Sequence, residues 1–263
     1  MKMKIEFLTQ EDSLYVLPFF EEFLRHYSAE FEITRISCCR AMGKRSRLQL
    51  LRELKWLYGV TGLSKLLFQA ASAKALSLLP RSRSASRYYS IAQLAKAYGI
   101  PYEHVANPNQ PDFTDALQQR SPELLISVAC PYILKEKVLG IPVRGCINIH
   151  HAPLPRYKGM MPTFWQLFHG EQQLGVTIHY MAAKVDEGDA LLQESLPVTS
   201  GESLHELIRR SKRHGAHCMA KVVRSIQANE AVPVQMDHAQ GSYFTFPRRE
   251  EALEFRRRGL RAI

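Results

Sequence analysis

Two polar residues suited to acyl-transfer chemistry, Asn148 and His150, lie two positions apart in the sequence. They follow an apolar segment, residues 141–147, that is typical of the approach to a buried strand. Because side chains two apart on a strand share one face, the amide and the imidazole should lie side by side. The imidazole can accept a proton from an attacking amine, and the amide N–H can stabilise the oxyanion that develops.

A third polar residue, Asp186, follows a second predicted strand at residues 176–181. Its loop could return to the same crevice, because polar side chains beyond the carboxyl ends of strands face the ligand in an open α/β sheet. Each residue alone also has an ordinary interpretation. Asn148 could be a turn residue and His150 a hydrogen-bonded strand end, while Asp186 could form an Asx turn before Gly188. The catalytic hypothesis therefore rests on the convergence of the three.

Two other kinds of site fit the sequence less well. A metal site built on His151 and His179 lacks the His-x-His spacing that such a site would need, so no metal is predicted. A thiol nucleophile needs a neighbouring base, which neither Cys130 nor Cys146 has. The long basic helical segment that begins near residue 203 carries three further histidines, which we expect to face solvent: His205, His214 and His217.

The spacing of these motifs resembles that of the folate-dependent formyltransferases, which act on glycinamide ribonucleotide, on methionyl-tRNA or on amino sugars of sugar nucleotides. The family pattern is N-x-H-x-S-L-L-P-x-x-x-G, then G-x-T-x-H, then D-x-G. Ala152 replaces the usual serine and Pro153 a leucine, which affects a local turn hydrogen bond rather than the catalytic trio. The resemblance covers about residues 120–225, and the matching positions are Asn148, His150, Leu154, Pro155, Gly159, Gly175, Thr177, His179, Asp186 and Gly188.

The resemblance implies direct transfer of a formyl group from N10-formyltetrahydrofolate to an amine through a tetrahedral intermediate. Asn148 would donate to the oxyanion, as would His150 when it is protonated. Asp186 would position His150 and an ordered water, and would help a proton reach the departing folate nitrogen. Core packing is the alternative for the side chains near the strand end. The residues expected to line the folate pocket are Tyr132, Ile133, Leu134, Val138, Val185 and Gly188.

The acceptor amine is less well defined by the resemblance. The turn at residues 9–13 has no glycine, so it cannot form the Gly-rich phosphate loop of the glycinamide ribonucleotide enzymes. We also expect no tRNA-binding domain, which favours a nucleotide-linked amino sugar as acceptor. Methionyl-tRNA is the alternative, because residues 40–47 form a basic segment. A formyltetrahydrofolate hydrolase, or a folate-binding or membrane-docked protein without enzymatic activity, is also compatible with these residues.

The elements that position these residues alternate along the chain. Strands are predicted at residues 4–8 and 31–37, with a helix at 14–25 between them, and the apolar run 124–129 is typical of a central parallel strand. This order predicts an α/β fold with a doubly wound, mostly parallel Rossmann-like sheet. We expect a catalytic domain at residues 1–230, with a helical basic insertion at 44–90, and a short C-terminal extension at 231–263.

Charge is distributed unevenly along the 263 residues. The formal net charge is +10, and residues 44–87 contain ten Lys or Arg but one acid, Glu53. Such a patch indicates nucleotide phosphates, RNA or an anionic membrane surface as partner, or a solvated helix face. No apolar run approaches the roughly 18 residues of a spanning helix. Five cysteines without a C-x-x-C motif argue against a disulfide framework, so a cytoplasmic location is expected. The oligomeric state is not predicted.

Overall fold

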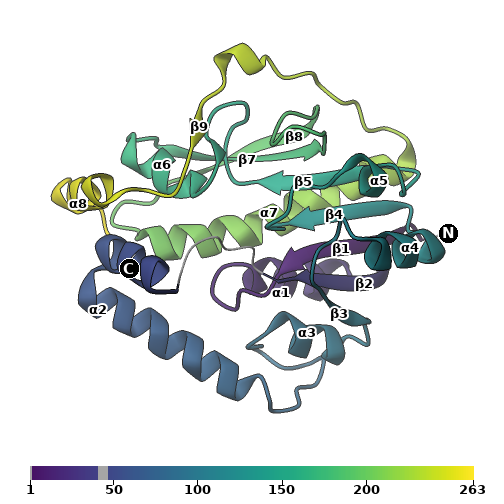
Figure 1. The fold of residues 1–263 in the computed structure, drawn as a ribbon, viewed down its shortest axis with the longest axis horizontal. Helices are drawn as coiled ribbons and strands as arrows, with labels where there is room; N and C mark the ends of the chain where they lie inside the picture. Colours follow the sequence, from purple (N-terminus) through teal and green to yellow (C-terminus); the bar gives the residue numbers. More distant parts are fainter. Residues whose placement is uncertain (1, 41–46) are drawn as a thin grey trace.

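The computed structural model describes residues 2–40 and 47–263 of the chain. Its centre is a seven-stranded sheet with the order β3-β2-β1-β4-β5-β7-β8 (Figure 1). The strands from β3 to β5 in this order are parallel, and β7 and β8 are antiparallel to their neighbours. The predicted doubly wound, mostly parallel sheet is therefore confirmed. The strands are β1 (Lys4–Gln10), β2 (Glu32–Cys39), β3 (Tyr102–Val105), β4 (Leu124–Val128), β5 (Cys146–His150), β6 (Lys158–Gly159), β7 (Gln173–Tyr180), β8 (Ala190–Pro197) and β9 (Tyr243–Phe244).

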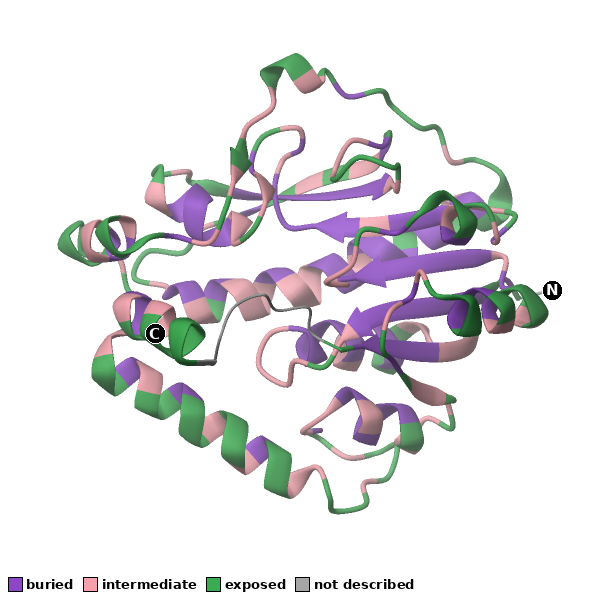
Figure 2. Ribbon diagram, viewed as in Figure 1, coloured by how far each residue is buried: buried purple, intermediate pink, exposed green. Residues whose placement is uncertain are grey.

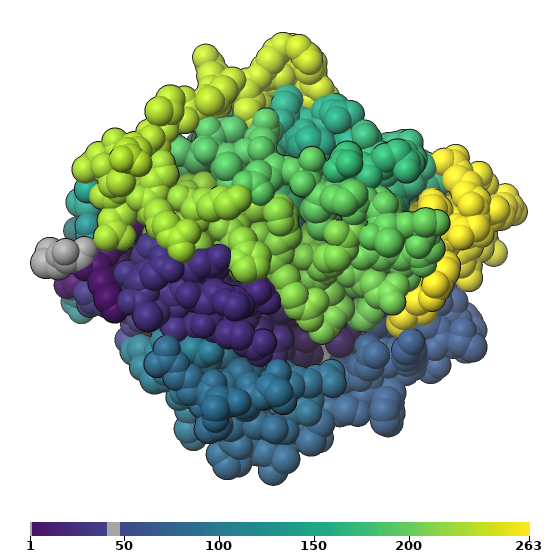
Figure 3. All heavy atoms as spheres, turned by 180° about the vertical axis from the view of Figure 1, so that it is seen from behind, coloured from purple at the N-terminus to yellow at the C-terminus, as the bar shows by residue number. Residues whose placement is uncertain are grey.

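Helices cover both faces of this sheet. On one face α1 and α7 pack against each other and share a core with Phe7, Ile126 and Ile149; Figure 3 shows them side by side from behind. On the opposite face α4 and α5 pack with Leu125 and Cys146. The helices are α1 (Leu17–Tyr27), α2 (Arg47–Leu76), α3 (Ile91–Ala97), α4 (Pro111–Arg120), α5 (Glu136–Leu139), α6 (Pro162–Phe168), α7 (Leu204–Ala228) and α8 (Arg249–Arg257), with a short 3-10 helix at His238–Gln240.

The central strand β4 is buried on both faces, and its sequence reflects this burial. All of its residues are buried (Figure 2), because β1 and β5 flank it and helices cover both of its faces. Its side chains alternate between the two cores, with Leu124 and Ile126 on the α1/α7 side and Leu125 on the α4/α5 side. A strand that is buried on both faces has no solvent-facing side, which is why the run at 124–129 is apolar apart from the buried Ser127.

The basic insertion is helical, as predicted, and its main helical neighbour is α8. α2 is interrupted at Gly59, whose φ of +71° is in the left-handed region. Leu57 and Leu66 reach the main core, whereas Phe68 is 74% exposed. No described helix is long and apolar enough to cross a membrane. The basic stretch 40–47 lies almost entirely outside the described residues, so RNA or membrane contact there stays a prediction.

The residues after 230 pack onto the same core as the rest of the chain. β9 pairs with β6, and Phe244 stacks on Trp165 with 4.7 Å between the ring centroids. Phe255 of α8 stacks on Phe164 at 4.8 Å and is fully buried. The predicted C-terminal extension is therefore part of the folded unit around α6, while the boundary at residue 230 stays a prediction.

The three histidines of α7 do not project freely into solvent, contrary to our expectation. His205 Nδ1 lies 3.1 Å from the Tyr15 hydroxyl, and His217 Nδ1 lies 2.6 Å from the Tyr27 hydroxyl. His214 faces β8 and is only partly exposed. The reason is that α7 packs along α1 and β8, so its polar face finds partners on those elements.

Candidate active site

Asn148 and His150 share one face of β5, as their spacing predicts, while Ile147 and Ile149 enter the α1/α7 core on the other face. The antiparallel pairing of β5 with β7 places His179 opposite Asn148. Asn148 Nδ2 lies 3.2 Å from His179 Nε2. The amide is therefore held by a side chain of the neighbouring strand.

The protonation of His179 follows from its two contacts. Its Nδ1 lies 2.8 Å from the carbonyl oxygen of Tyr180, which can only accept, so Nδ1 carries the hydrogen. Burial lowers the pKa of His179 below its usual value. The ring is thus neutral near pH 7, and its Nε2 accepts a hydrogen bond from the Asn148 amide. One amide hydrogen of Asn148 is used in this way, and the second is available to a ligand.

His150 is buried and oriented by the turn that follows it. Its Nε2 donates to the carbonyl oxygen of Tyr157 at 2.8 Å, since that oxygen can only accept. In the neutral ring the lone pair is then on Nδ1, which lies 3.7 Å from Asp186 Oδ2. This separation exceeds a hydrogen bond, but it lets the carboxylate stabilise a positive charge on the ring.

Asp186 reaches the site because the loop between β7 and β8 folds back over the sheet. Its Oδ2 accepts a hydrogen bond from the Gly159 N–H at 3.1 Å, and its Oδ1 lies 3.7 Å from His179 Nε2. Asp186 has a φ of +55°, a conformation that aspartate tolerates better than most residues. A Cβ atom on Gly188 would collide with the Tyr180 carbonyl, so only glycine allows this close return of the loop.

The turn after β5 is held from the neighbouring strand. The Thr177 hydroxyl donates to the Ala152 carbonyl at 2.7 Å and accepts from the Leu154 N–H at 3.1 Å. Ala152 itself has no hydroxyl, so Thr177 supplies a turn hydrogen bond from β7. Sequence reasoning recognised Thr177 as part of a motif but did not predict this role, because the contact joins two strands whose pairing is a tertiary feature.

Comparison with known proteins shows which family this chain belongs to. A family model described as Formyl transferase matches residues 72–223, more than half of the chain. The chain belongs to this formyl transferase family.

Curated relatives match this chain over part of their own length. Over 159 residues it is 37% identical to the methionyl-tRNA formyltransferase of Syntrophus aciditrophicus, a match that covers 60% of this chain and 51% of the relative. The chain thus spans about half the length of the curated relatives it matches.

Solved structures show the same fold over nearly the whole chain. The phosphoribosylglycinamide formyltransferase from Anaplasma phagocytophilum has a TM-score of 0.61 and 17% identity, covering 93% of this chain and 98% of its own. A sugar 3N-formyl transferase solved in the presence of dTDP and 5-N-formyl-THF has a TM-score of 0.55 and 15% identity. The match covers 100% of this chain and 83% of the sugar enzyme.

The six residues predicted to line a folate pocket differ in their exposure. Ile133 is 58% exposed and Val185 is 42% exposed, so both are open to a ligand. Leu134 and Val138 are buried in the α4/α5 core, which matches the alternative of core packing for their side chains. Tyr132 is partly buried and donates to the Ala106 carbonyl, whereas Gly188 contributes only backbone.

The loop that carries Ile133 is fixed by an asparagine that sequence reasoning missed. Asn109 Nδ2 donates to the Ile133 carbonyl at 2.9 Å, and Asn109 Oδ1 accepts from the Lys135 N–H at 2.8 Å. The two bonds make this loop a rigid wall rather than a free connection. No local signal marks Asn109, because its partners lie more than twenty positions away in the sequence.

His151 next to the site predicts a loss of stability in acid. The ring is buried, and neither nitrogen has a hydrogen-bond partner among the described residues. Burial lowers the pKa of His151 well below 6.5, and the charge of Lys212 lowers it further. Below pH 6.5 the unfolded chain binds a proton that the folded chain does not. The free energy of unfolding should therefore decrease as the pH is lowered below 6.5. For this residue the decrease is at most about 1.4 kcal/mol per pH unit.

The variant His151→Leu isolates that contribution. It removes the proton uptake and an unpartnered buried imidazole, so we expect equal or greater stability at pH 7.5 and a shallower loss between pH 6.5 and 5.5. Urea unfolding at several pH values measures both effects. The pKa of His179 is lowered as well, so other residues also contribute to the slope of unfolding free energy against pH in the wild type. The contribution of His151 is therefore the difference between the slopes of the wild type and the variant. Identical slopes would contradict the prediction.

Proposed function

We propose that this chain transfers the formyl group of N10-formyltetrahydrofolate to a primary amine. The observation that carries the proposal is the convergence of Asn148, His150 and Asp186 from one strand, β5, and the returning loop between β7 and β8. His150 Nδ1 is 3.7 Å from the Asp186 carboxylate, and Asn148 is on the same face of β5 with one amide hydrogen available. A base, a carboxylate that stabilises its charged form, and an oxyanion donor are what formyl transfer to an amine requires.

In the proposed reaction the amine attacks the formyl carbon and a tetrahedral intermediate forms. Asn148 donates its second amide hydrogen to the developing oxyanion. His150 accepts the proton of the amine on Nδ1, and the nearby Asp186 stabilises the resulting imidazolium. His150 then returns this proton to the folate nitrogen as the carbon–nitrogen bond breaks. The products are a formamide and tetrahydrofolate.

The proposed folate pocket uses apolar surface beside this trio. Ile133 and Val185 expose apolar side chains, and the loop of Ile133 is held rigid by Asn109. A flat pterin ring gains from such contacts, and backbone groups of rigid loops give its polar edge fixed partners. We assign Leu134 and Val138 to the buried layer that supports this wall, and Tyr132 and Gly188 to its edges.

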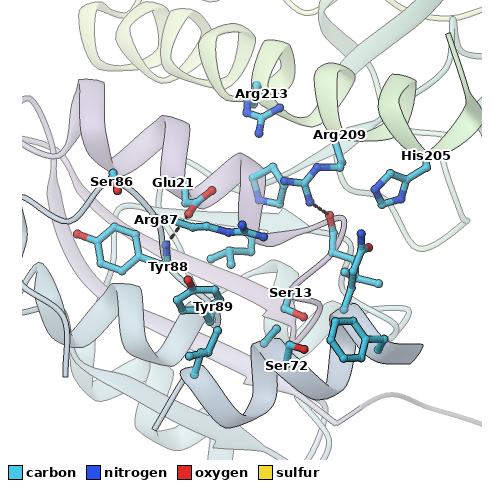
Figure 4. A pocket seen from close by; sticks show the side chains of 17 residues that line it. Ser13, Glu21, Ser72, Ser86, Arg87, Tyr88, Tyr89, His205, Arg209 and Arg213 are labelled. Carbon is cyan, nitrogen blue, oxygen red and sulfur yellow. Dashed lines mark hydrogen bonds between the residues drawn. The ribbon is translucent and has the colours of Figure 1, made fainter. Parts of the chain in front are cut away.

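We propose a nucleotide-linked amino sugar as the acceptor. A cavity of 620 Å³ lies between α1, α2, α7 and the segment 86–89 (Figure 4). Ser13 and Leu14 of its lining belong to the loop after β1, which lies at the same carboxyl edge of the parallel strands as His150. Its lining includes Arg87, Arg209 and Arg213 but only one carboxylate, Glu21. Burial and the neighbouring charge of Arg213 lower the pKa of Arg209, as expected where positive charge is not balanced.

Methionyl-tRNA is a second candidate acceptor, favoured by the name of the relative from Syntrophus aciditrophicus. The sugar nucleotide fits better, because the arginines line a cavity of 620 Å³ between helices, which suits a small anion, rather than an open basic face. A sugar 3N-formyl transferase of the same fold was solved in the presence of dTDP and 5-N-formyl-THF, so an acceptor of this class is compatible with the fold.

The direct test measures tetrahydrofolate release from N10-formyltetrahydrofolate. The wild type and the His150→Gln variant are compared with a panel of nucleotide-linked amino sugars and with charged methionyl-tRNA. Release that requires one acceptor and is lost in the variant supports the proposal and identifies the acceptor class. Release without any acceptor indicates a hydrolase, and failure to bind the formyl folate would overturn the proposal.

The arginine cavity predicts a separable effect on acceptor binding. Arg213 has no ion-pair partner among the described residues, so its guanidinium is available for a phosphate. We expect Arg213→Ala to raise the KM for a nucleotide-linked acceptor about 10–100-fold with little change in kcat, because a charged hydrogen bond contributes about 1.5–3 kcal/mol.

The matched control is Arg249→Ala, which removes an exposed arginine from α8. Its kinetic constants should equal those of the wild type. An unchanged KM in Arg213→Ala, with the enzyme otherwise active, would remove the cavity from the acceptor site but leave the catalytic trio in place.

A further inference from the structure

Three side chains with metal-binding atoms meet on the α1/α7 side of the sheet. His214 and Cys218 are four residues apart on α7, so they lie one above the other on the same helix face. Glu194 of β8 points toward them, because its strand partner Val176 belongs to the α1/α7 core. Asn148 and His150 occupy the opposite face of the sheet, so this cluster is separate from the candidate active site.

The spacing of the three atoms fits a single small cation. Glu194 Oε2 lies 3.3 Å from His214 Nε2 and 3.5 Å from Cys218 Sγ, and the nitrogen and the sulfur are 3.4 Å apart. In a tetrahedral zinc site the bonds are about 2.0–2.3 Å, so neighbouring ligand atoms are about 3.3–3.7 Å apart. An ion just above the plane of the triangle would reach all three atoms without a change of rotamer.

Hydrogen bonding alone accounts for only two of the three contacts. The thiol and the imidazole Nε2 can each donate one hydrogen, and both can donate to Glu194 Oε2. The contact between Cys218 Sγ and His214 Nε2 is then left without a hydrogen between its atoms. A cation satisfies the three lone pairs together.

The surroundings of the cluster suit a divalent ion. Cys218 is buried, whereas the side chains of His214 and Glu194 are 28% and 26% exposed, which leaves a direction open for water as a fourth ligand. Lys221 Nζ binds the other carboxylate oxygen of Glu194 at 2.7 Å and thereby fixes the carboxylate. A thiolate and a carboxylate together balance the two charges of the ion.

We propose that Glu194, His214 and Cys218 form a zinc site that joins β8 to α7. The mixture of sulfur, nitrogen and oxygen ligands favours Zn²⁺, and a sulfur ligand disfavours Ca²⁺ and Mg²⁺. The ion holds the end of the sheet against the long helix. Because the folded chain alone presents all three ligands together, the ion stabilises the folded state.

The test uses Co²⁺ as a spectroscopic substitute for Zn²⁺ on the purified, tag-free, chelator-treated chain. We expect one equivalent of Co²⁺ to produce the intense visible bands of a tetrahedral site and a thiolate-to-cobalt charge-transfer band, both abolished by added Zn²⁺. Saturating Zn²⁺, at about a hundredfold excess over Kd, should raise the thermal unfolding midpoint by about 5–10 °C.

Variants assign these signals to the three residues. Cys218→Ser should abolish the charge-transfer band, and His214→Gln and Glu194→Gln should each weaken Co²⁺ binding at least tenfold. Cys146→Ser and His217→Gln are the matched controls and should keep the full spectrum. If Cys218→Ser fails to fold, as shown by circular dichroism, the partly exposed His214 still provides the test. Absence of the band in the wild type, or its persistence in Cys218→Ser or His214→Gln, would overturn the proposal.

Discussion

Replacing His150 with glutamine is expected to lower kcat for formyl transfer by about 10²–10⁴-fold. Glutamine can still donate to the Tyr157 carbonyl, which His150 Nε2 contacts at 2.8 Å, so the turn after β5 should be preserved. It cannot accept a proton on the side that faces Asp186. The loss should therefore appear in kcat, with little effect on the KM values of folate and acceptor.

The pH dependence separates this role from a structural one. In the wild type, one limb of the plot of kcat/KM against pH should report the protonation of the general base, and this limb should be absent in His150→Gln. His104→Gln, at an exposed position on β3, is the matched control and should behave as the wild type does. A loss smaller than about tenfold, or an unchanged pH profile, would exclude His150 as the general base.

Removing the amide of Asn148 is expected to cost about 10²–10³-fold in kcat, or roughly 2.7–4 kcal/mol of transition-state stabilisation. Asn148 Nδ2 uses one hydrogen for His179 Nε2, at 3.2 Å, and the other is proposed to bind the oxyanion. Asn148→Ala removes the donor. Asn148→Asp keeps the shape but places a negative charge where the oxyanion forms, so it should be at least as damaging.

The control for this position is Ser127→Ala on β4, because Ser127 is the strand partner of Asn148 and is a buried polar side chain. It should change kcat by only a few-fold. Equilibrium binding of the formyl folate should stay similar in Asn148→Ala, since the oxyanion exists only in the transition state. A loss of kcat under roughly threefold would be far below the effect of an oxyanion donor, and would remove Asn148 from that role.

Local patterns predicted the central elements well and the packing of the insertion less well. The near-continuous apolar run at 124–129 predicts the buried strand β4, because burial on both faces leaves no solvent-facing position. For α2 the helical type was predicted correctly, but its contact with α8 was not. The partners of a surface helix depend on how distant segments fold back, and such information is absent from its own periodicity.

The same distinction applies to polar side chains. The face shared by Asn148 and His150 follows from their spacing of two on a strand. His205 and His217, expected in solvent, instead contact Tyr15 and Tyr27, since α7 packs along α1. The amphipathic pattern of a helix shows which face is buried, but it does not show which polar groups will border that face.

By itself the sequence determined the fold class, the family resemblance and the pairing of an amide with an imidazole on β5, because spacing within one strand or motif follows from local backbone geometry. Only the tertiary structure decided that Asp186 returns to within 3.7 Å of His150, and that Glu194 meets His214 and Cys218. These contacts join residues that are 20 or more positions apart. They depend on strand order, on antiparallel pairing and on the packing of α7, which no local pattern contains.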